Sequence, residues 1–144
     1  MKFLVLNGPN LNLLGKREPG VYGTGTYAGL CAEIAAYAAA RGIRADIRQS
    51  NHEGVLIDEI QAADGVYDGI VINPGAYTHY SYAIYDALLA VRVPAVEVHI
   101  SDISRREAFR RTAPACRGQI VGHGFRGYLE AMELLENIHK EDMK

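Results

Sequence analysis

Residues 3 to 25 have the sequence Phe-Leu-Val-Leu-Asn-Gly-Pro-Asn-Leu-Asn-Leu-Leu-Gly-Lys-Arg-Glu-Pro-Gly-Val-Tyr-Gly-Thr-Gly. The four apolar residues at its start predict a buried strand, and the alanine-rich run that follows it predicts a helix. A strand and a helix in a compact domain are usually joined by only a few residues. This much longer connection, with its five glycines and two prolines, is typical of a functional lid. A disordered surface loop is the alternative.

The rest of the chain alternates predicted strands with predicted helices. Strands are expected at residues 2–7, 44–49, 68–73, 93–99 and 119–123, and helices from residue 26, at 54–63, at 79–91 and at 128–138. Ser104 and Glu107 match a capping box that would open a short basic helix before the last strand. The pattern predicts one α/β domain over residues 1–144. Its five-stranded parallel sheet should have the flavodoxin-like order 2-1-3-4-5, with helices on both faces.

The composition is that of an ordinary globular domain, with 49% hydrophobic residues and a formal net charge of -2. This charge provides no electrostatic basis for binding nucleic acid or an anionic membrane, and no apolar run approaches the length of a membrane span. Cys31 and Cys116 are far apart and form no metal-type pair. They predict reduced, structural thiols in a cytoplasmic protein.

Polar side chains gather where the predicted strands end. Asn7 ends the first strand and Asn10 follows it, Asn73 ends the third strand, and Glu97 and His99 end the fourth. Ligands of open parallel sheets bind at the carboxyl ends of the strands, near the point where the strand order reverses. The functional site is therefore expected at this edge of the sheet.

Two pairs of side chains suit acid–base chemistry. His99 carries an imidazole, the side chain that most often transfers protons in enzymes, and Glu97 lies two residues earlier on the same side of the strand. The carboxylate is expected to fix the imidazole tautomer, although a purely structural Glu–His pair is the alternative. In the lid, the cation of Arg17 beside Tyr22 would favour the phenolate, which is a competent base.

Other candidates are suited to holding a ligand. The segment from Asn73 to His79 brings an amide and an imidazole to a helix start, where backbone N–H groups favour an anion or a polyol. His79 alternatively caps that helix, and Asp86 lies two helical turns further on, facing the same way. Ser101 offers backbone donors after the fourth strand. Arg110 belongs to a cluster of four arginines that suits a carboxylate, or that simply covers a solvated surface.

Several cofactor chemistries lack their sequence signals. No glycine-rich dinucleotide or P-loop motif follows the first strand, and the histidines are scattered without metal-ligand spacing. No lysine falls at an interior strand end, where a Schiff-base mechanism would need one. The residues favour acid–base chemistry without metal or cofactor, on an anionic, hydroxylated small molecule.

Five segments together resemble type II 3-dehydroquinate dehydratases. They are Asn7-Gly-Pro-Asn-Leu-Asn-Leu-Leu-Gly15, Arg17-Glu-Pro-Gly-Val-Tyr-Gly23, Arg48-Gln-Ser-Asn-His-Glu-Gly54, Asn73-Pro-Gly-Ala-Tyr-Thr-His79 and Glu97-Val-His-Ile-Ser101. The resemblance spans nearly the whole chain and implies a flavodoxin-like fold, usually assembled as a homododecamer of four trimers. It also implies reversible trans-dehydration of 3-dehydroquinate to 3-dehydroshikimate through an enolate, in the shikimate pathway or in quinate breakdown, without metal or cofactor.

The resemblance also implies catalytic roles for five residues. Tyr22 matches the base that removes a proton next to the ketone, and Arg17 matches the lid arginine that stabilises the enolate-like transition state. Asn10 matches the group that acts with a bound water on the enolate oxygen. His99 matches the proton donor to the departing hydroxyl, with Glu97 as its partner.

Substrate contacts follow from the same resemblance. Asn73, His79 and Arg110 match groups that contact the substrate hydroxyls, and the backbone of Ile100–Ser101 matches the cradle for the substrate carboxylate. Asp86 matches a residue that reaches the substrate region from a neighbouring subunit.

Tyr80 departs from the family pattern, which usually has a small residue after the position of His79, so pocket or trimer packing is expected to differ there. A flavodoxin-like binding module without catalysis, holding a nucleotide or a polyol acid, is the alternative function.

Overall fold

The computed structural model describes residues 1–16, 20, 25–106 and 109–144 of the chain. Within these residues, five parallel strands form one sheet in the order β2-β1-β3-β4-β5, which confirms the predicted topology. The strands are β1 (Lys2–Asn7), β2 (Arg44–Gln49), β3 (Gly69–Asn73), β4 (Ala95–His99) and β5 (Gly118–Val121). Asn7 and Asn73 are register partners, so two asparagines lie side by side where β1 and β3 end.

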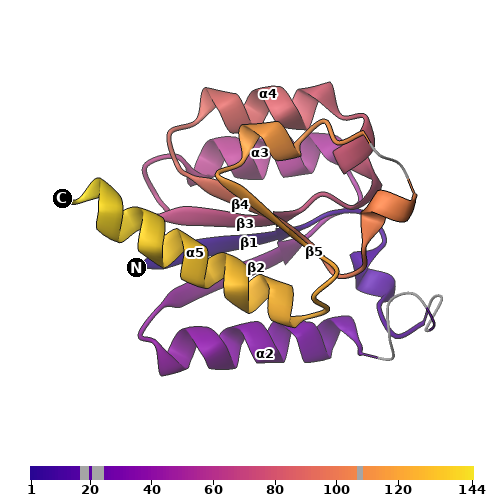
Figure 1. The fold of residues 1–144 in the computed structure, drawn as a ribbon, viewed down its shortest axis with the longest axis horizontal. Helices are drawn as coiled ribbons and strands as arrows, with labels where there is room; N and C mark the ends of the chain where they lie inside the picture. Colours follow the sequence, from indigo (N-terminus) through magenta and orange to yellow (C-terminus); the bar gives the residue numbers. More distant parts are fainter. Residues whose placement is uncertain (17–19, 21–24, 107–108) are drawn as a thin grey trace.

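The helices cover both faces of the sheet. The α-helices are α2 (Tyr27–Ala40), α3 (Glu53–Ala63), α4 (Tyr82–Ala90) and α5 (Arg126–Asp142). Short 3-10 helices occur at η1 (Leu11–Leu13), η2 (Gly75–His79), η3 (Ile103–Arg105) and η4 (Ala113–Ala115). In Figure 1, α3 and α4 lie on one face, and α2 and α5 lie on the other. The amino terminus is at the left of that view, so β1 and the strands parallel to it run towards the right.

Strand β1 contributes to two hydrophobic cores. Phe3 and Val5 pack with the residues of α2 and α5, whereas Leu4 and Leu6 pack with those of α3 and α4. Successive side chains of a strand point to opposite faces, so a strand covered on both faces needs an unbroken apolar run. The apolar run at the start of the chain therefore places β1 inside the sheet. Strand β2 is partly exposed at the edge, as its alternating polar residues predict.

The helix predicted over residues 79–91 is divided into two pieces. The 3-10 helix η2 ends at His79, and α4 begins only after Ser81, whose Oγ accepts a hydrogen bond of 3.0 Å from the backbone N–H of Ile84. Serine favours such a cap because its hydroxyl binds an N–H that the helix itself leaves unpaired. His79 and Asp86 therefore lie on separate helices, and the expectation that they share one helical face is wrong.

The capping box predicted at Ser104 is also wrong. Asp102 caps η3 instead, because its Oδ1 accepts bonds from the backbone N–H of Ser104 at 3.0 Å and from the Ser104 hydroxyl at 2.6 Å. An aspartate readily binds the backbone two residues further on, and this short-range bond fixes the turn. Glu107, the other half of the predicted box, lies outside the described residues.

The loops that follow β1 and β3 approach one another closely. The backbone N–H of Gly8 donates a hydrogen bond of 2.7 Å to the carbonyl oxygen of Asn73. A side chain at Gly8 would place its Cβ 2.7 Å from the carbonyl oxygen of Pro74, so only glycine fits. Gly75 has a φ of 58°, a left-handed conformation that also favours glycine. These contacts pack the two loops together where the strand order reverses.

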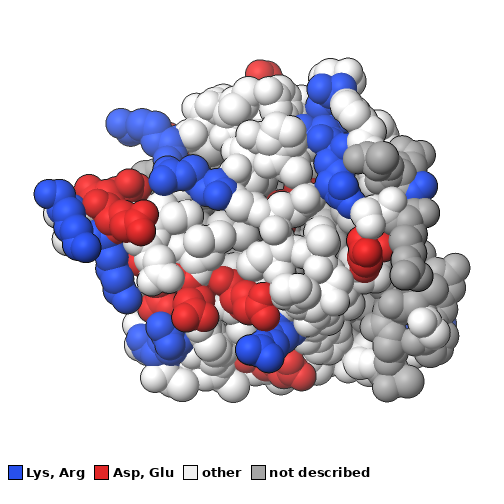
Figure 2. All heavy atoms as spheres, in the orientation of Figure 1, with Lys and Arg blue, Asp and Glu red and all other residues white. Residues whose placement is uncertain are grey.

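The surface carries charges of both signs. On the face shown in Figure 2, acidic and basic side chains are interspersed rather than gathered into one field of a single sign. Among the described residues, no helix is long and apolar enough to cross a membrane.

Candidate active site

A pocket of about 300 Å³ opens at the carboxyl ends of β1, β3 and β4. It is lined by Pro9–Leu11, Leu14, Asn73, Gly75, Ala76, His79, His99–Ser101, Ile103 and Arg106. These residues come from the loops after three neighbouring strands and from the 3-10 helices beside them. A pocket of this size suits a small molecule, and it lies where parallel α/β sheets bind their ligands.

Six of the eleven predicted site residues line this pocket. They are Asn10, Asn73, His79, His99, Ile100 and Ser101. Residues that are as far apart in the sequence as 10 and 101 meet here because the parallel strands end at one edge of the sheet. Glu97 lies directly behind the lining, as the following contacts show.

His99 is held by Glu97 through a buried hydrogen bond. The Nε2 atom of His99 lies 3.1 Å from Oε1 of Glu97, and both side chains are buried. A carboxylate only accepts hydrogen bonds, so Nε2 carries the proton of this contact. Nδ1 is then the ring nitrogen available to a ligand, and the predicted fixing of the tautomer by Glu97 is consistent with this geometry.

Three more donors surround the buried carboxylate of Glu97. The hydroxyl groups of Thr78 and Thr112 each donate to Oε1 at 2.7 Å, and the Gln119 amide donates to Oε2 at 3.2 Å. Hydrogen bonds to a buried polar group offset the loss of water around it. Thr78 lies in the segment from Asn73 to His79 that was singled out from the sequence, but its contact with Glu97 was not predicted. Thr112 and Gln119 were not predicted at all, because they come from separate elements and meet Glu97 only in the folded chain.

Asn10 is fixed through its backbone. It has a φ of 69°, a left-handed conformation that asparagine tolerates better than most residues. Its N–H donates to Oδ1 of Asn51 at 3.0 Å, and its carbonyl accepts from the N–H of Leu13 at 2.9 Å. The Gln49 amide donates to the same Asn51 oxygen at 3.0 Å. Gln49 and Asn51 were not predicted as site residues, although their position at the end of β2 is the kind of signal that identified the others.

His79 is oriented by the segment that follows η3. Its Nδ1 lies 2.9 Å from the carbonyl oxygen of Phe109, which only accepts, so Nδ1 carries a proton. In its neutral form, His79 therefore presents Nε2 as an acceptor. The backbone N–H of Arg111 donates to the carbonyl of Thr78 at 2.5 Å, which ties the same two segments together.

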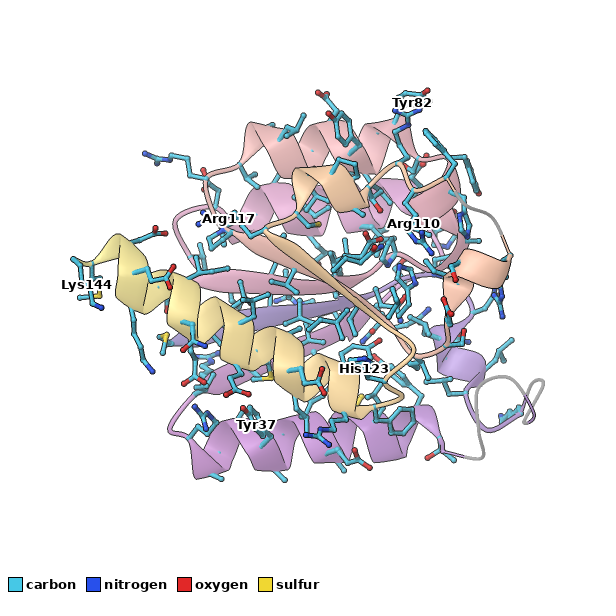
Figure 3. The ribbon with its side chains drawn as sticks, viewed as in Figure 1. Tyr37, Tyr82, Arg110, Arg117, His123 and Lys144 are labelled. Carbon is cyan, nitrogen blue, oxygen red and sulfur yellow. The ribbon has the colours of Figure 1, made fainter. Side chains whose placement is uncertain are left out.

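Among the described residues, the arginine in the pocket lining is Arg106, whereas the family resemblance implied Arg110 as a substrate contact. Arg110 lies near the carboxyl ends of the strands (Figure 3), and its buried Nε has no hydrogen-bond partner among the described residues. Arg111 packs against the rings of Tyr82 and Phe109, at 3.8 and 4.3 Å from their centroids. The cluster of arginines was recognisable in the sequence, but spacing alone does not show which member faces the pocket.

The remaining predicted residues are not part of the described lining. Asp86 is exposed on α4 and lies outside the lining of this pocket. Arg17 and Tyr22, the two side chains expected to act from the lid, lie outside the described residues.

The fold and the pocket define a class of protein. It is a flavodoxin-like α/β domain with a hydrogen-bonded carboxylate–imidazole pair at the switch point, arranged for acid–base chemistry on a small polar molecule.

Comparisons with known proteins identify the family within this class. Residues 1–136 match the family described as dehydroquinase class II. The 3-dehydroquinate dehydratase of Clostridium acetobutylicum is 55% identical over 141 residues, which cover 96% of this chain and 98% of that protein. The crystal structure of type II dehydroquinase from Butyrivibrio crossotus superposes with a TM-score of 0.92 at 52% identity, covering 94% of this chain and 97% of that one. The chain belongs to the class II dehydroquinase family.

A more distant structural relative has the same fold. A 3-dehydroquinate dehydratase-like protein from Bifidobacterium longum has a TM-score of 0.73 at 30% identity, covering 96% of this chain and 97% of that one. The architecture is thus retained in relatives with much lower sequence identity.

Proposed function

We propose that this protein is a hydro-lyase that dehydrates 3-dehydroquinate to 3-dehydroshikimate, with His99 as the general acid. The observation that carries the proposal is the buried Glu97–His99 pair beside a pocket whose lining includes Asn10, Asn73 and His79, on the scaffold of a dehydratase family. Loss of a hydroxyl group as water requires a proton at the leaving oxygen. When both ring nitrogens of His99 carry protons, Nδ1 can deliver its proton to the leaving oxygen, while Glu97 keeps its hydrogen bond to Nε2 and holds the ring in place.

The other half of the reaction needs a base and a site for the enolate. Tyr22, activated by Arg17, removes the proton beside the ketone, and Asn10 binds the oxygen on which negative charge develops. The hydroxyl group then leaves with the proton from His99, so one water is released and the ring gains a conjugated double bond. The backbone of Ile100–Ser101 receives the substrate carboxylate, since it lies in the lining next to His99.

The remaining contacts concern the substrate hydroxyl groups. Asn73 and His79 lie in the lining and offer an amide and an imidazole. Arg110 contributes a cation from the same end of the sheet, and the pocket-lining Arg106 adds a second positive charge for an anionic substrate.

The test is turnover of 3-dehydroquinate, followed by the absorbance of the conjugated enone product. We expect turnover by the unmodified protein and none above background by His99→Ala, which also controls for dehydratase carried over from the expression host. A folded, assembled protein that leaves 3-dehydroquinate unchanged contradicts the proposal.

We also infer that the working form is a cytoplasmic homo-oligomer, a dodecamer built from trimers. In this assembly Asp86 acts on the pocket of a neighbouring subunit, as the family resemblance implies; it is exposed on α4 and therefore accessible to a second chain. Exposed apolar side chains on and beside α4 support an interface there: Tyr80, Tyr82 and Leu89 are 60, 63 and 56% exposed. The two cysteines are free thiols, as a reducing compartment requires.

Analytical ultracentrifugation tests the assembly. The expected species has twelve times the chain mass of 15.8 kDa, or three times that mass if the trimers separate. A single species at the chain mass contradicts the inference.

A further inference from the structure

A buried chain of hydrogen bonds joins the last helix to the pocket. The N–H of Gly75 donates to Oδ1 of Asn73 at 3.1 Å, Nδ2 of Asn73 donates to the Tyr128 hydroxyl at 3.0 Å, and that hydroxyl donates to Oδ1 of Asn7 at 2.6 Å. Asn7, Asn73 and Tyr128 are 0, 3 and 0% exposed. Of these three side chains, only Asn73 belongs to the pocket lining.

The backbone N–H of Gly75 sets the donor-to-acceptor direction of this series of hydrogen bonds. The N–H of Gly75 is a donor and cannot accept, so the Asn73 atom that faces it must be the oxygen. The Asn73 nitrogen therefore faces Tyr128, and the Tyr128 oxygen accepts from it. The single hydroxyl proton of Tyr128 is then left for the oxygen of Asn7.

The opposite direction would place two donors against each other. If the Asn73 amide were turned by 180°, its NH2 group would face the N–H of Gly75. In the observed direction, the amide nitrogen of Asn7 is left for the phenol of Tyr27, which also interacts with this side chain. The amide of Asn73, beside the pocket, has both of its inner contacts satisfied.

Tyr128 keeps its hydroxyl proton over a wide pH range. A phenol is already protonated at neutral pH, and loss of solvent raises the pKa of Tyr128 further, although the bond from Asn73 opposes this shift. The hydroxyl therefore remains a donor into the alkaline range. A tyrosinate in this place could not donate to Asn7.

We propose that Tyr128 is a positioning residue for the ligand: the N–H of Gly75 sets the orientation of the Asn73 amide, and Tyr128 holds the amide in place by taking one of its N–H groups, so that the other N–H, and not the oxygen, is left for the pocket. Asn73 has two amide protons, and one of them is taken by Tyr128. The other is the only donor that this side chain can offer to a bound molecule. The site therefore selects a ligand with a hydrogen-bond acceptor, such as a hydroxyl or carbonyl oxygen, at this point.

This inference rests on the proposed function for its kinetic test. The contact is made with a part of the substrate that does not change in the reaction, so it should contribute equally to binding the substrate and its transition state. Loss of such a contact raises KM and leaves kcat unchanged.

The variant is Tyr128→Phe, which removes one oxygen atom and keeps the ring. We expect KM for 3-dehydroquinate to rise about tenfold, with kcat within about twofold of the unmodified protein. The matched control is Tyr67→Phe, which removes a phenol that donates to Asp46 at 2.8 Å at the other end of the sheet. The control should leave both constants unchanged. The inference is overturned by an unchanged KM in Tyr128→Phe, or by a fall in kcat at constant KM.

Nuclear magnetic resonance provides a second measurement that does not depend on turnover. The side-chain amide signals of Asn73 are assigned by their absence in Asn73→Asp. In the unmodified protein, the amide proton bonded to Tyr128 should exchange with solvent more slowly than its partner. Tyr128→Phe should remove this difference, and Tyr67→Phe should retain it.

The two measurements separate the possible failures. If the unmodified protein is inactive, the proposed function fails while the exchange of the Asn73 amide still decides the inference. If Tyr128→Phe does not fold, hydrogen exchange in the unmodified protein still tests the inference. Equal exchange rates of the two Asn73 amide protons would show that Tyr128 does not hold the amide.

Discussion

Glu97 shows how a charged residue is accommodated in the interior of this protein. It is fully buried, and its two oxygens accept bonds from hydroxyl groups, an amide and the imidazole of His99. A buried carboxylate without such donors would be strongly destabilising. The donors fix the carboxylate in one orientation, and the carboxylate then fixes the ring of His99.

Replacement of Glu97 by glutamine tests this role. The Glu97→Gln side chain has the same shape but carries an NH2 group, which cannot accept bonds from its neighbours. We expect kcat to fall roughly 100-fold, because His99 loses both its orientation and the negative charge that stabilises its protonated form. The control is Glu53→Gln, since Glu53 accepts a bond from Ser81 outside the pocket lining. An unchanged kcat in Glu97→Gln would contradict the role of this carboxylate.

Arg17 and Tyr22 give a second test at this scale. Tyr22→Phe removes the proposed base, and Arg17→Ala removes the cation that favours the phenolate. Each change should lower kcat by about 100-fold or more, while the midpoint of urea unfolding stays the same. Normal turnover in either variant would refute the role assigned to that residue. Tyr67→Phe serves again as the control for loss of a phenol.

At the scale of elements, the break between η2 and α4 determines where His79 lies. A continuous helix would carry His79 on the same axis as Asp86. Instead, the backbone turns at residues 80–81, so His79 lies in the pocket lining. The helix α4 begins after this turn and covers the outer side of the sheet. Ser81 fixes this break with two bonds: it accepts from the N–H of Ile84 and donates to Glu53 at 2.6 Å.

Removal of this cap should destabilise the protein measurably. We expect Ser81→Ala to lower the free energy of unfolding by about 1–2 kcal/mol, from urea denaturation. Thr26→Ala provides the comparison, because Thr26 also caps a helix but is exposed, and among the described residues its side chain accepts one bond, from Gly29 at 3.0 Å. The loss at Ser81 should be the larger of the two. An equal or smaller loss at Ser81 would show that its second bond adds nothing.

At the scale of the whole molecule, the buried tyrosine predicts a response to alkaline pH. In the folded protein burial raises the pKa of Tyr128, whereas in the unfolded chain the phenol releases its proton near pH 10. The contribution of the protonated Tyr128 phenol to the free energy of unfolding is fully present below pH 10. Above it, the unfolded chain loses a proton that the folded protein retains, so the free energy of unfolding falls by up to about 1.4 kcal/mol per pH unit.

Urea denaturation between pH 9 and 11.5 measures this slope. The slope above pH 10 should be smaller in Tyr128→Phe than in the unmodified protein. Tyr27 contributes to the remaining slope, since burial raises its pKa to about 12. Identical slopes in the two proteins would show that Tyr128 does not titrate in this way.

The sequence predicts the plan of the molecule better than its detailed contacts. Apolar runs alternate with helical patterns, and that order is enough to derive the parallel sheet and to place Asn73 and His99 at one edge of it. Local patterns do not reveal Thr112, which contacts Glu97 from a short loop. They also do not reveal Tyr128, which contacts Asn7 from helix α5 on one face of the sheet. Such contacts depend on the packing of elements that are distant in the chain.

The span of the Tyr128–Asn7 contact has a consequence for how the protein matures during synthesis. The two residues are 121 positions apart, so most of the polypeptide must leave the ribosome before they can meet. Until then, the asparagines at the ends of β1 and β3 lack the phenol that orders them. We expect a nascent chain that stops short of α5 to form part of the sheet without a ligand-ready pocket. Binding competence should therefore appear late, and it would report that the final helix has docked.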